Sequence, residues 1–300
     1  MRIADYEITK EEGGIVVDGV TNFVPKHVFE NGQSFRWKRE DDGSYTGIVQ
    51  GKVVNINYIN ARLLIRNATI DDFQSLWFYY FDLGTNYTEV EAQLLSVDPI
   101  LAEPIRFGHG LRMLKQDFWE VLVSYITSAR ARIEKIGMSV EAICQAYDNR
   151  VDYLGRTFYA FPSPEMVVNG RIDMLLRLKL GLTRAENIFS AAEALVQKKI
   201  DVKSLGILPV EEARGVLQKL RGVGPKIADC TLSFSGIRKD VFPTDRWMKR
   251  VMEKLYDQQL TNETAVYRYA KQRYGSLMSY AQGYLFYWEY SMSSSSSRSL

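Results

Sequence analysis

A glycine hairpin between two helical segments is the feature that most constrains the fold of this chain. The apolar residues before it keep helical spacing, which predicts a helix that runs to Arg221 and stops at Gly222 and Gly224. Glycine permits the positive φ angles that a tight reversal needs. Pro225 suits the first position of a second helix, where no backbone N–H is required. The sequence therefore predicts a helix, a hairpin and a helix over about residues 212–235.

The start of the second helix is predicted to attract an anion. Its first backbone N–H groups have no partner within the helix, and they lie at the positive end of the helix dipole. A phosphate therefore fits there. Lys226 belongs to the first turn, Cys230 lies one turn further along the same face, and Asp245 follows Pro243-Thr244.

Composition limits the class of protein. A chain of 300 residues with 46% hydrophobic residues can bury a sizeable core and form two or three subdomains. No apolar run approaches the ~18–20 residues that span a bilayer, and no signal-peptide core follows Met1. We therefore expect a soluble intracellular protein, cytoplasmic or nucleoid-associated in a bacterium and nuclear in a eukaryote.

Metal chemistry and strong charge are both unsupported by the composition. The two cysteines, Cys144 and Cys230, cannot supply four thiolates for an iron–sulfur cluster. The two histidines, His27 and His109, are too few and too far apart in sequence to indicate a metal site. A net charge of +2 gives only weak support for a polyanionic partner, so charge has to be judged locally.

The N-terminal part of the chain has the pattern of β-structure. Residues 13–66 contain β-branched and aromatic runs separated by turn signals such as Asp41-Asp42-Gly43, which predicts an antiparallel sheet. Helical spacing, with Asp117 as a candidate cap, begins after Leu111. We expect an α+β fold with a β-domain at 1–108, a helical domain at 109–290 and a Ser-rich, disordered tail at 291–300.

At the hairpin the chain resembles the helix-hairpin-helix DNA glycosylases, and most closely their 8-oxoguanine branch. The run Gly-Val-Gly-Pro-Lys-Ile-Ala-Asp-Cys at 222–230 matches the hairpin of that branch, and Pro243-Thr244-Asp245 matches its aspartate motif. The resemblance implies that Lys226 is the nucleophile and that Asp245 is the essential carboxylate. It also implies DNA-backbone contacts at Gly222, Gly224 and Thr244. By itself, Lys226 could instead be a phosphate-contacting lysine, and Asp245 a helix N-cap.

Further motifs of the resemblance define a base pocket. Gly32 opens Gly-Gln-Ser-Phe-Arg-Trp, where the family places a backbone carbonyl that accepts from N7–H of 8-oxoguanine, a donor that guanine lacks. Gln282 and Phe286 are four residues apart on one helix, matching the residues that hold the edge and face of the base. Cys230 would cover the opposite face. Without the resemblance, the same residues are consistent with a turn and a packed helix.

The chain departs from the family where the opposite base is read. Arg130-Ala131 replace consecutive asparagines, and Lys135 replaces an arginine that often reads cytosine. Arg184 matches a second cytosine-reading arginine, while Thr183 replaces a bulkier wedge. Arg130, Lys135 and Arg184 are the expected DNA-binding side chains. Because lysine cannot make the bidentate base contact of arginine, we expect weaker preference for cytosine opposite the lesion.

The resemblance implies a bifunctional DNA glycosylase and AP lyase. Lys226 must be uncharged to attack the sugar, so the closed pocket has to remove water from the amine. The expected partner is double-stranded DNA with an oxidised purine, bound by a monomer without a membrane. No cofactor is required, although the resemblance allows a monovalent or divalent cation at the hairpin backbone. The alternatives are an alkylpurine glycosylase of the same superfamily and a non-catalytic module that clamps DNA.

Overall fold

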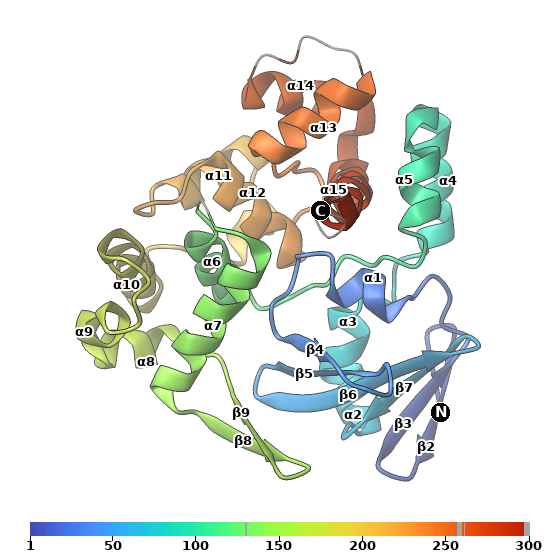
Figure 1. The fold of residues 1–300 in the computed structure, drawn as a ribbon, viewed down its shortest axis with the longest axis horizontal. Coiled ribbons are helices and arrows are strands. Elements are labelled where there is room, and N and C mark those ends of the chain that lie inside the picture. The colour runs from blue at the N-terminus through green and yellow to red at the C-terminus, as the bar shows by residue number, and fades with distance from the viewer. Residues whose placement is uncertain (130, 257–259, 261, 297–300) are drawn as a thin grey trace.

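The protein consists of a β-sheet at one end and a larger body of helices beside it (Figure 1). The computed structural model describes residues 1–129, 131–256, 260 and 262–296. An antiparallel sheet followed by mostly helical structure confirms the predicted α+β class. None of the described helices is both long and apolar enough to cross a bilayer.

The main sheet has seven antiparallel strands in the order β1-β2-β3-β7-β6-β5-β4. The strands are β1 (Arg2–Ile3), β2 (Tyr6–Glu11), β3 (Gly14–Asp18), β4 (Trp37–Arg39), β5 (Tyr45–Val49), β6 (Lys52–Ile59) and β7 (Arg62–Arg66). The predicted strands between 13 and 66 are confirmed. Strands β1 and β2 were not predicted, because most side chains of β2 are polar and exposed, which leaves this strand without an apolar face.

Aromatic side chains pack one face of the sheet. Most of them come from two parts of the chain. These are helix α1 (Pro25–Phe29) and the continuous helical segment formed by α2 (Ile70–Asp72), a π-helical turn (Phe73–Trp77) and α3 (Phe78–Tyr80). The rings of Phe29 and Trp37 stack with centroids 4.2 Å apart, and Trp37 Nε1 donates to the Tyr80 hydroxyl over 2.9 Å. These contacts fix both ends of the 30–36 segment, which carries Gly32.

The helical body contains most of the remaining chain. Its helices are α4 (Tyr87–Val97), α5 (Ala102–Phe107), α6 (Phe118–Thr127), α7 (Ile133–Tyr147), α8 (Pro164–Asn169), α9 (Arg171–Leu176), α10 (Leu182–Val196), α11 (Val210–Gln218), α12 (Pro225–Phe234), α13 (Arg246–Tyr256), α14 (Glu263–Tyr274) and α15 (Met278–Ser296). A hairpin of β8 (Arg150–Tyr153) and β9 (Arg156–Tyr159) follows α7, and short 3-10 turns lie at 99–101, 204–206 and 275–277. Asp117 caps α6 as predicted, accepting from Glu120 N over 2.9 Å.

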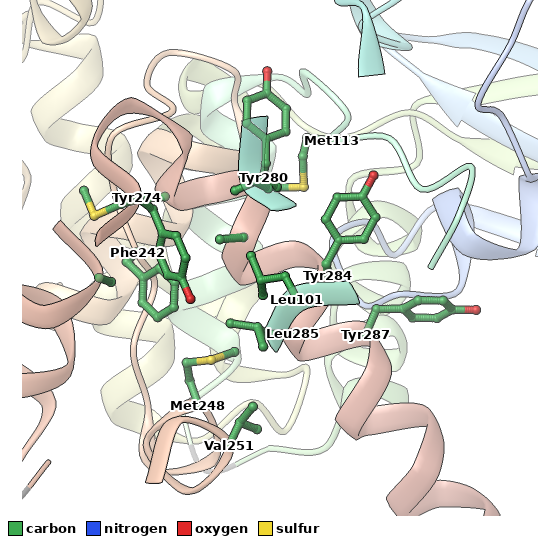
Figure 2. Close-up of a cluster of buried hydrophobic side chains, with 14 of the residues drawn as sticks. Leu101, Met113, Phe242, Met248, Val251, Tyr274, Tyr280, Tyr284, Leu285 and Tyr287 are labelled. Carbon is green, nitrogen blue, oxygen red and sulfur yellow. The ribbon is translucent and has the colours of Figure 1, made fainter. Parts of the chain in front are cut away.

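Helix α15 runs through the centre of one helical core. Its residues Tyr284 and Leu285 pack with Leu101 beside α5 and with Met248 of α13 (Figure 2). Helices α4 and α5 thus belong to the helical core, although they precede residue 108, where the sequence analysis places the domain boundary. The Ser-rich segment was predicted to be disordered, but α15 continues through it to Ser296. The remainder of that predicted tail lies outside the described residues.

The hairpin forms between α11 and α12. Helix α11 ends at Gln218, before the predicted stop at Arg221. Gly222 has φ +76°, and a Cβ atom there would collide with the Asn187 side chain, so only glycine fits. Gly224 has an extended conformation, so the positive φ predicted for both glycines applies to Gly222 alone. Pro225 begins α12 as predicted.

Candidate active site

A cavity of about 150 Å³ lies between the 31–35 segment and helices α6, α12 and α15. Every residue predicted as catalytic or base-binding lines it: Gly32, Lys226, Cys230, Asp245, Gln282 and Phe286. Phe35, Met113, Tyr125, Ser128 and Phe234 contribute further parts of the wall. A cavity of this size can hold an aromatic ring. The tertiary structure therefore brings together residues separated by most of the chain.

Lys226 projects into this cavity from the first turn of α12. Its Nζ atom donates to Ser128 Oγ over 3.2 Å and lies 4.8 Å from the centroid of the Tyr125 ring. The Ser128 hydroxyl itself donates to the Tyr125 carbonyl over 2.7 Å, which leaves its oxygen to accept from the amine. Ser128 and Tyr125 were not among the predicted site residues, because nothing in their local sequence distinguishes them from core and cap positions.

Asp245 combines a structural position with access to the cavity. Its Oδ1 atom accepts from Trp247 N over 3.0 Å and from Met248 N over 2.9 Å, so the carboxylate caps the start of α13. The cap uses only Oδ1 and leaves Oδ2 outside it. Within the described residues, no ion pair joins Asp245 to Lys226. Asp245 can therefore cap α13 and still present its carboxylate to the cavity.

Gly32 occupies a backbone position that would strain any residue with a Cβ atom. Its φ angle is +81°, and a Cβ atom there would lie 2.6 Å from Ile133 Cδ1. The neighbouring Gln33 is buried: its Nε2 atom donates to the carbonyls of Val28 over 2.9 Å and Arg112 over 2.7 Å. Its Oε1 atom accepts from Leu114 N over 2.9 Å. These bonds attach the segment that carries Gly32 to α1 and to the chain that leads into α6.

Cys230, Gln282 and Phe286 form further walls of the cavity. Burial raises the pKa of the Cys230 thiol to about 12, although nearby Lys226 opposes the shift. The thiol is therefore neutral at physiological pH and presents a packing surface rather than a nucleophile. Gln282 is 5% exposed, and the Phe286 ring stacks on Tyr290 with centroids 5.9 Å apart. The side chains of Gln282 and Phe286 reach the cavity from the same face of α15.

The predicted DNA-binding residues that the structure describes do not line the cavity. Lys135 is exposed in the first turn of α7, and Arg184 donates to the carbonyls of Ala129 over 2.5 Å and Leu180 over 2.9 Å. The Thr244 hydroxyl is buried and donates to the Phe242 carbonyl over 2.8 Å, so a DNA contact there would have to come from the backbone. Arg130 lies outside the described residues.

The hairpin glycines occupy the turn and the N-terminus of α12. Gly222 lies in the turn, and Gly224 is the residue that precedes the first turn of α12, where the backbone N–H groups are free of intrahelical bonds. In the part of the chain that the structure describes, no group of three or more His, Cys, Asp or Glu side chains could hold a metal ion.

Comparisons with known proteins agree with this geometry. Residues 16–122 match the family model described as 8-oxoguanine DNA glycosylase, N-terminal domain. The chain is 38% identical to MBOgg1, solved in complex with a low affinity DNA ligand, with a TM-score of 0.92 over 96% of this chain and 99% of that one. It is 32% identical to Clostridium acetobutylicum 8-oxoguanine glycosylase/lyase, solved with double-stranded DNA containing cytosine opposite 8-oxoG, with a TM-score of 0.91 over 96% and 98% of the two chains.

A further relative is similar to this chain over most of its length. The probable N-glycosylase/DNA lyase of Methanothermobacter thermautotrophicus is 29% identical over 225 residues, which cover 69% of this chain and 70% of that protein. The fold and the lysine–aspartate cavity are those of a helix-hairpin-helix DNA glycosylase. Within that class, this chain belongs to the 8-oxoguanine DNA glycosylase family.

Proposed function

We propose that this protein excises 8-oxoguanine from double-stranded DNA and then cleaves the strand at the resulting abasic site. The observation that carries the proposal is that one cavity holds an amine at Lys226, a carboxylate at Asp245 and a backbone carbonyl at Gly32. Only a base turned out of the duplex can reach this cavity. Extrusion costs a few kcal/mol, which contacts in the pocket have to offset.

The Gly32 carbonyl would recognise the lesion. It accepts a hydrogen bond from N7–H of 8-oxoguanine, whereas guanine presents a lone pair at the same position. A buried acceptor that loses its partner costs about 1–3 kcal/mol, which separates the two bases by roughly 5- to 150-fold. The cavity residues Cys230 and Phe286 cover the faces of the purine, and Gln282 meets its Watson–Crick edge.

Lys226 would perform the substitution at the sugar. The Nζ atom forms a bond to C1′ as the C1′–N9 bond breaks, and the base leaves with the electron pair of that bond. Loss of a proton from the amine and opening of the C1′–O4′ bond give an imine between enzyme and sugar. Loss of a C2′ proton then expels the 3′ phosphate by β-elimination. The Asp245 carboxylate stabilises the positive charge that develops on the sugar.

Substitution of the lysine tests the proposal. Lys226→Gln should abolish both excision and the covalent DNA adduct that borohydride traps with the unmodified protein, because the amide is not a nucleophile. Lys254→Gln is the matched control, since Lys254 is exposed and pairs with Glu289 on the surface. A binding module would shift an 8-oxoguanine duplex without nicking it, and an alkylpurine glycosylase would excise without trapping. Either result would contradict the proposal.

The protein should discriminate only weakly between the four bases that can lie opposite 8-oxoguanine. Lys135 is exposed at the start of α7, and an ammonium group cannot make the bidentate contact to a base that a guanidinium makes. Excision rates on duplexes with each of the four bases opposite 8-oxoguanine test this. Strict dependence on cytosine would contradict it.

We propose that the reaction needs no cofactor and that the protein acts as a monomer. The nucleophile and the carboxylate both belong to the chain, so neither step requires a metal ion. Excision should therefore persist in EDTA, and loss of activity that a divalent cation restores would contradict this. A cation at the hairpin backbone stays a separate prediction. Sedimentation with and without DNA tests the monomer.

A further inference from the structure

The Gly32 carbonyl accepts a hydrogen bond from within the protein. The Tyr125 hydroxyl donates to it over 3.3 Å. Tyr125 is 5% exposed, and its ring is held between Phe234, stacked at 5.3 Å, and Phe35, in an edge-on contact at 6.2 Å. The packing of the Tyr125 ring therefore holds the hydroxyl in place at the Gly32 carbonyl.

The phenol is suited to remain a donor. Burial raises the pKa of Tyr125 well above its ordinary value, and the nearby Cys230 and Asp245 raise it further. The hydroxyl therefore keeps its proton across the physiological range. A carbonyl oxygen has two lone pairs, so Gly32 can accept from Tyr125 and from a second donor at once.

This contact changes the consequence of placing the wrong base in the cavity. If the carbonyl depended on the base alone, a purine without N7–H would leave a buried acceptor unpaired. With the Tyr125 hydroxyl in place, the carbonyl keeps one partner whichever purine enters. The penalty that would reject such a base is therefore reduced.

We infer that Tyr125 is a specificity-determining residue, whose hydroxyl lowers the discrimination against purines that lack an N7–H donor. The inference rests on the proposed function, because it assumes that the Gly32 carbonyl reads the base. It assigns to the hydroxyl a role in selecting the base and none in the chemistry at the sugar.

Tyr125→Phe tests the inference, because it keeps the packed ring and removes only the donor. Single-turnover excision is measured on duplexes with 8-oxoguanine and with 8-methoxyguanine, which has a C8 substituent but no N7–H. We expect the ratio of the two rates to rise by about tenfold in the variant. Tyr267→Phe is the matched control, since the Tyr267 hydroxyl has no hydrogen-bond partner in the described residues and lies outside the cavity.

The ratio of the two excision rates separates this role from an effect on Lys226, whose amine also contacts the Tyr125 ring. A change at the amine would alter the excision rates of both bases by the same factor and leave their ratio unchanged. An unchanged or lower rate ratio in Tyr125→Phe would overturn the inference. Failure of the unmodified protein to excise 8-oxoguanine would instead overturn the proposed function.

Discussion

The Nζ atom of Lys226 donates a hydrogen bond to the Oγ atom of Ser128 over 3.2 Å. The contact joins the first turn of α12 to the C-terminal cap of α6, two residues that are 98 positions apart in the sequence. It fixes the direction of the amine in the cavity, where the Tyr125 ring also contacts the amine.

Loss of this hydrogen bond should slow the chemical step. We expect Ser128→Ala to lower single-turnover excision and imine trapping by up to about tenfold, because the hydrogen bond holds the attacking amine in position and such a bond contributes about 0.5–1.5 kcal/mol. Ser139→Ala is the control, since the Ser139 hydroxyl also donates to a helix carbonyl, that of Lys135, but is partly exposed and does not line the cavity. An unchanged rate in Ser128→Ala would show that the amine is held by other contacts.

Two substitutions of Asp245 should separate its cap from its chemistry. Asn has an oxygen that can still accept from Trp247 N and Met248 N, so Asp245→Asn should keep its thermal stability and lose most excision. Asp245→Ala should lose excision as well and about 1 kcal/mol of stability. The checks are thermal unfolding and single-turnover excision, and substantial excision by Asp245→Asn would contradict a role for the carboxylate.

Gly32→Ala should destabilise the protein through two terms that can be separated. The positive φ costs about 1–2 kcal/mol for alanine, and the new Cβ atom meets Ile133 Cδ1. Gly43→Ala is the control for the first term, since Gly43 has φ +83° and open space around it. Adding Ile133→Val removes Cδ1 and should restore part of the lost stability. Denaturant unfolding measures each variant, and equal losses at Gly32 and Gly43 would exclude the collision.

A buried ion pair behind the hairpin should be important for stability. Arg214 Nε lies 2.8 Å from Asp229 Oδ1, and the Asp229 side chain is 2% exposed. Arg214→Met should cost about 3–5 kcal/mol, because it leaves a buried carboxylate without its cation. Arg221→Met is the contrast: Arg221 pairs with Glu186 at 2.6 Å, but its side chain is 56% exposed, and we expect a loss below about 1 kcal/mol. Similar losses in chemical denaturation would contradict this.

Glu120 should make stability depend on pH. Burial raises the pKa of its carboxyl group from 4.5 to about 7, against the opposing effect of Arg36. The folded state therefore favours the neutral acid, and this contribution is complete below about pH 4.5 and is lost as the pH rises through 7. Glu120→Gln should flatten the decline of unfolding free energy between those values. Denaturant melts at a series of pH values check this, and an unchanged slope would contradict it.

Local chemistry determined a large part of this protein. Pro225 and the cap at Asp117 depend on the backbone needs of the next few residues, so they could be predicted from neighbours alone. The base-binding and catalytic residues were found for another reason: the motifs around Gly32, Lys226 and Gln282 keep both type and spacing, and the cavity contains all of them.

Tertiary structure decided what depends on contacts between distant segments. No local pattern indicates that α4 and α5 pack in the helical core, or that a polar strand such as β2 joins the sheet by backbone hydrogen bonds. The same holds for the Tyr125 hydroxyl at the Gly32 carbonyl and for Ser128 at Lys226. Sequence fixes which groups a residue offers, but only packing determines which groups they meet, because the partners lie on separate elements whose relative position is a property of the whole fold.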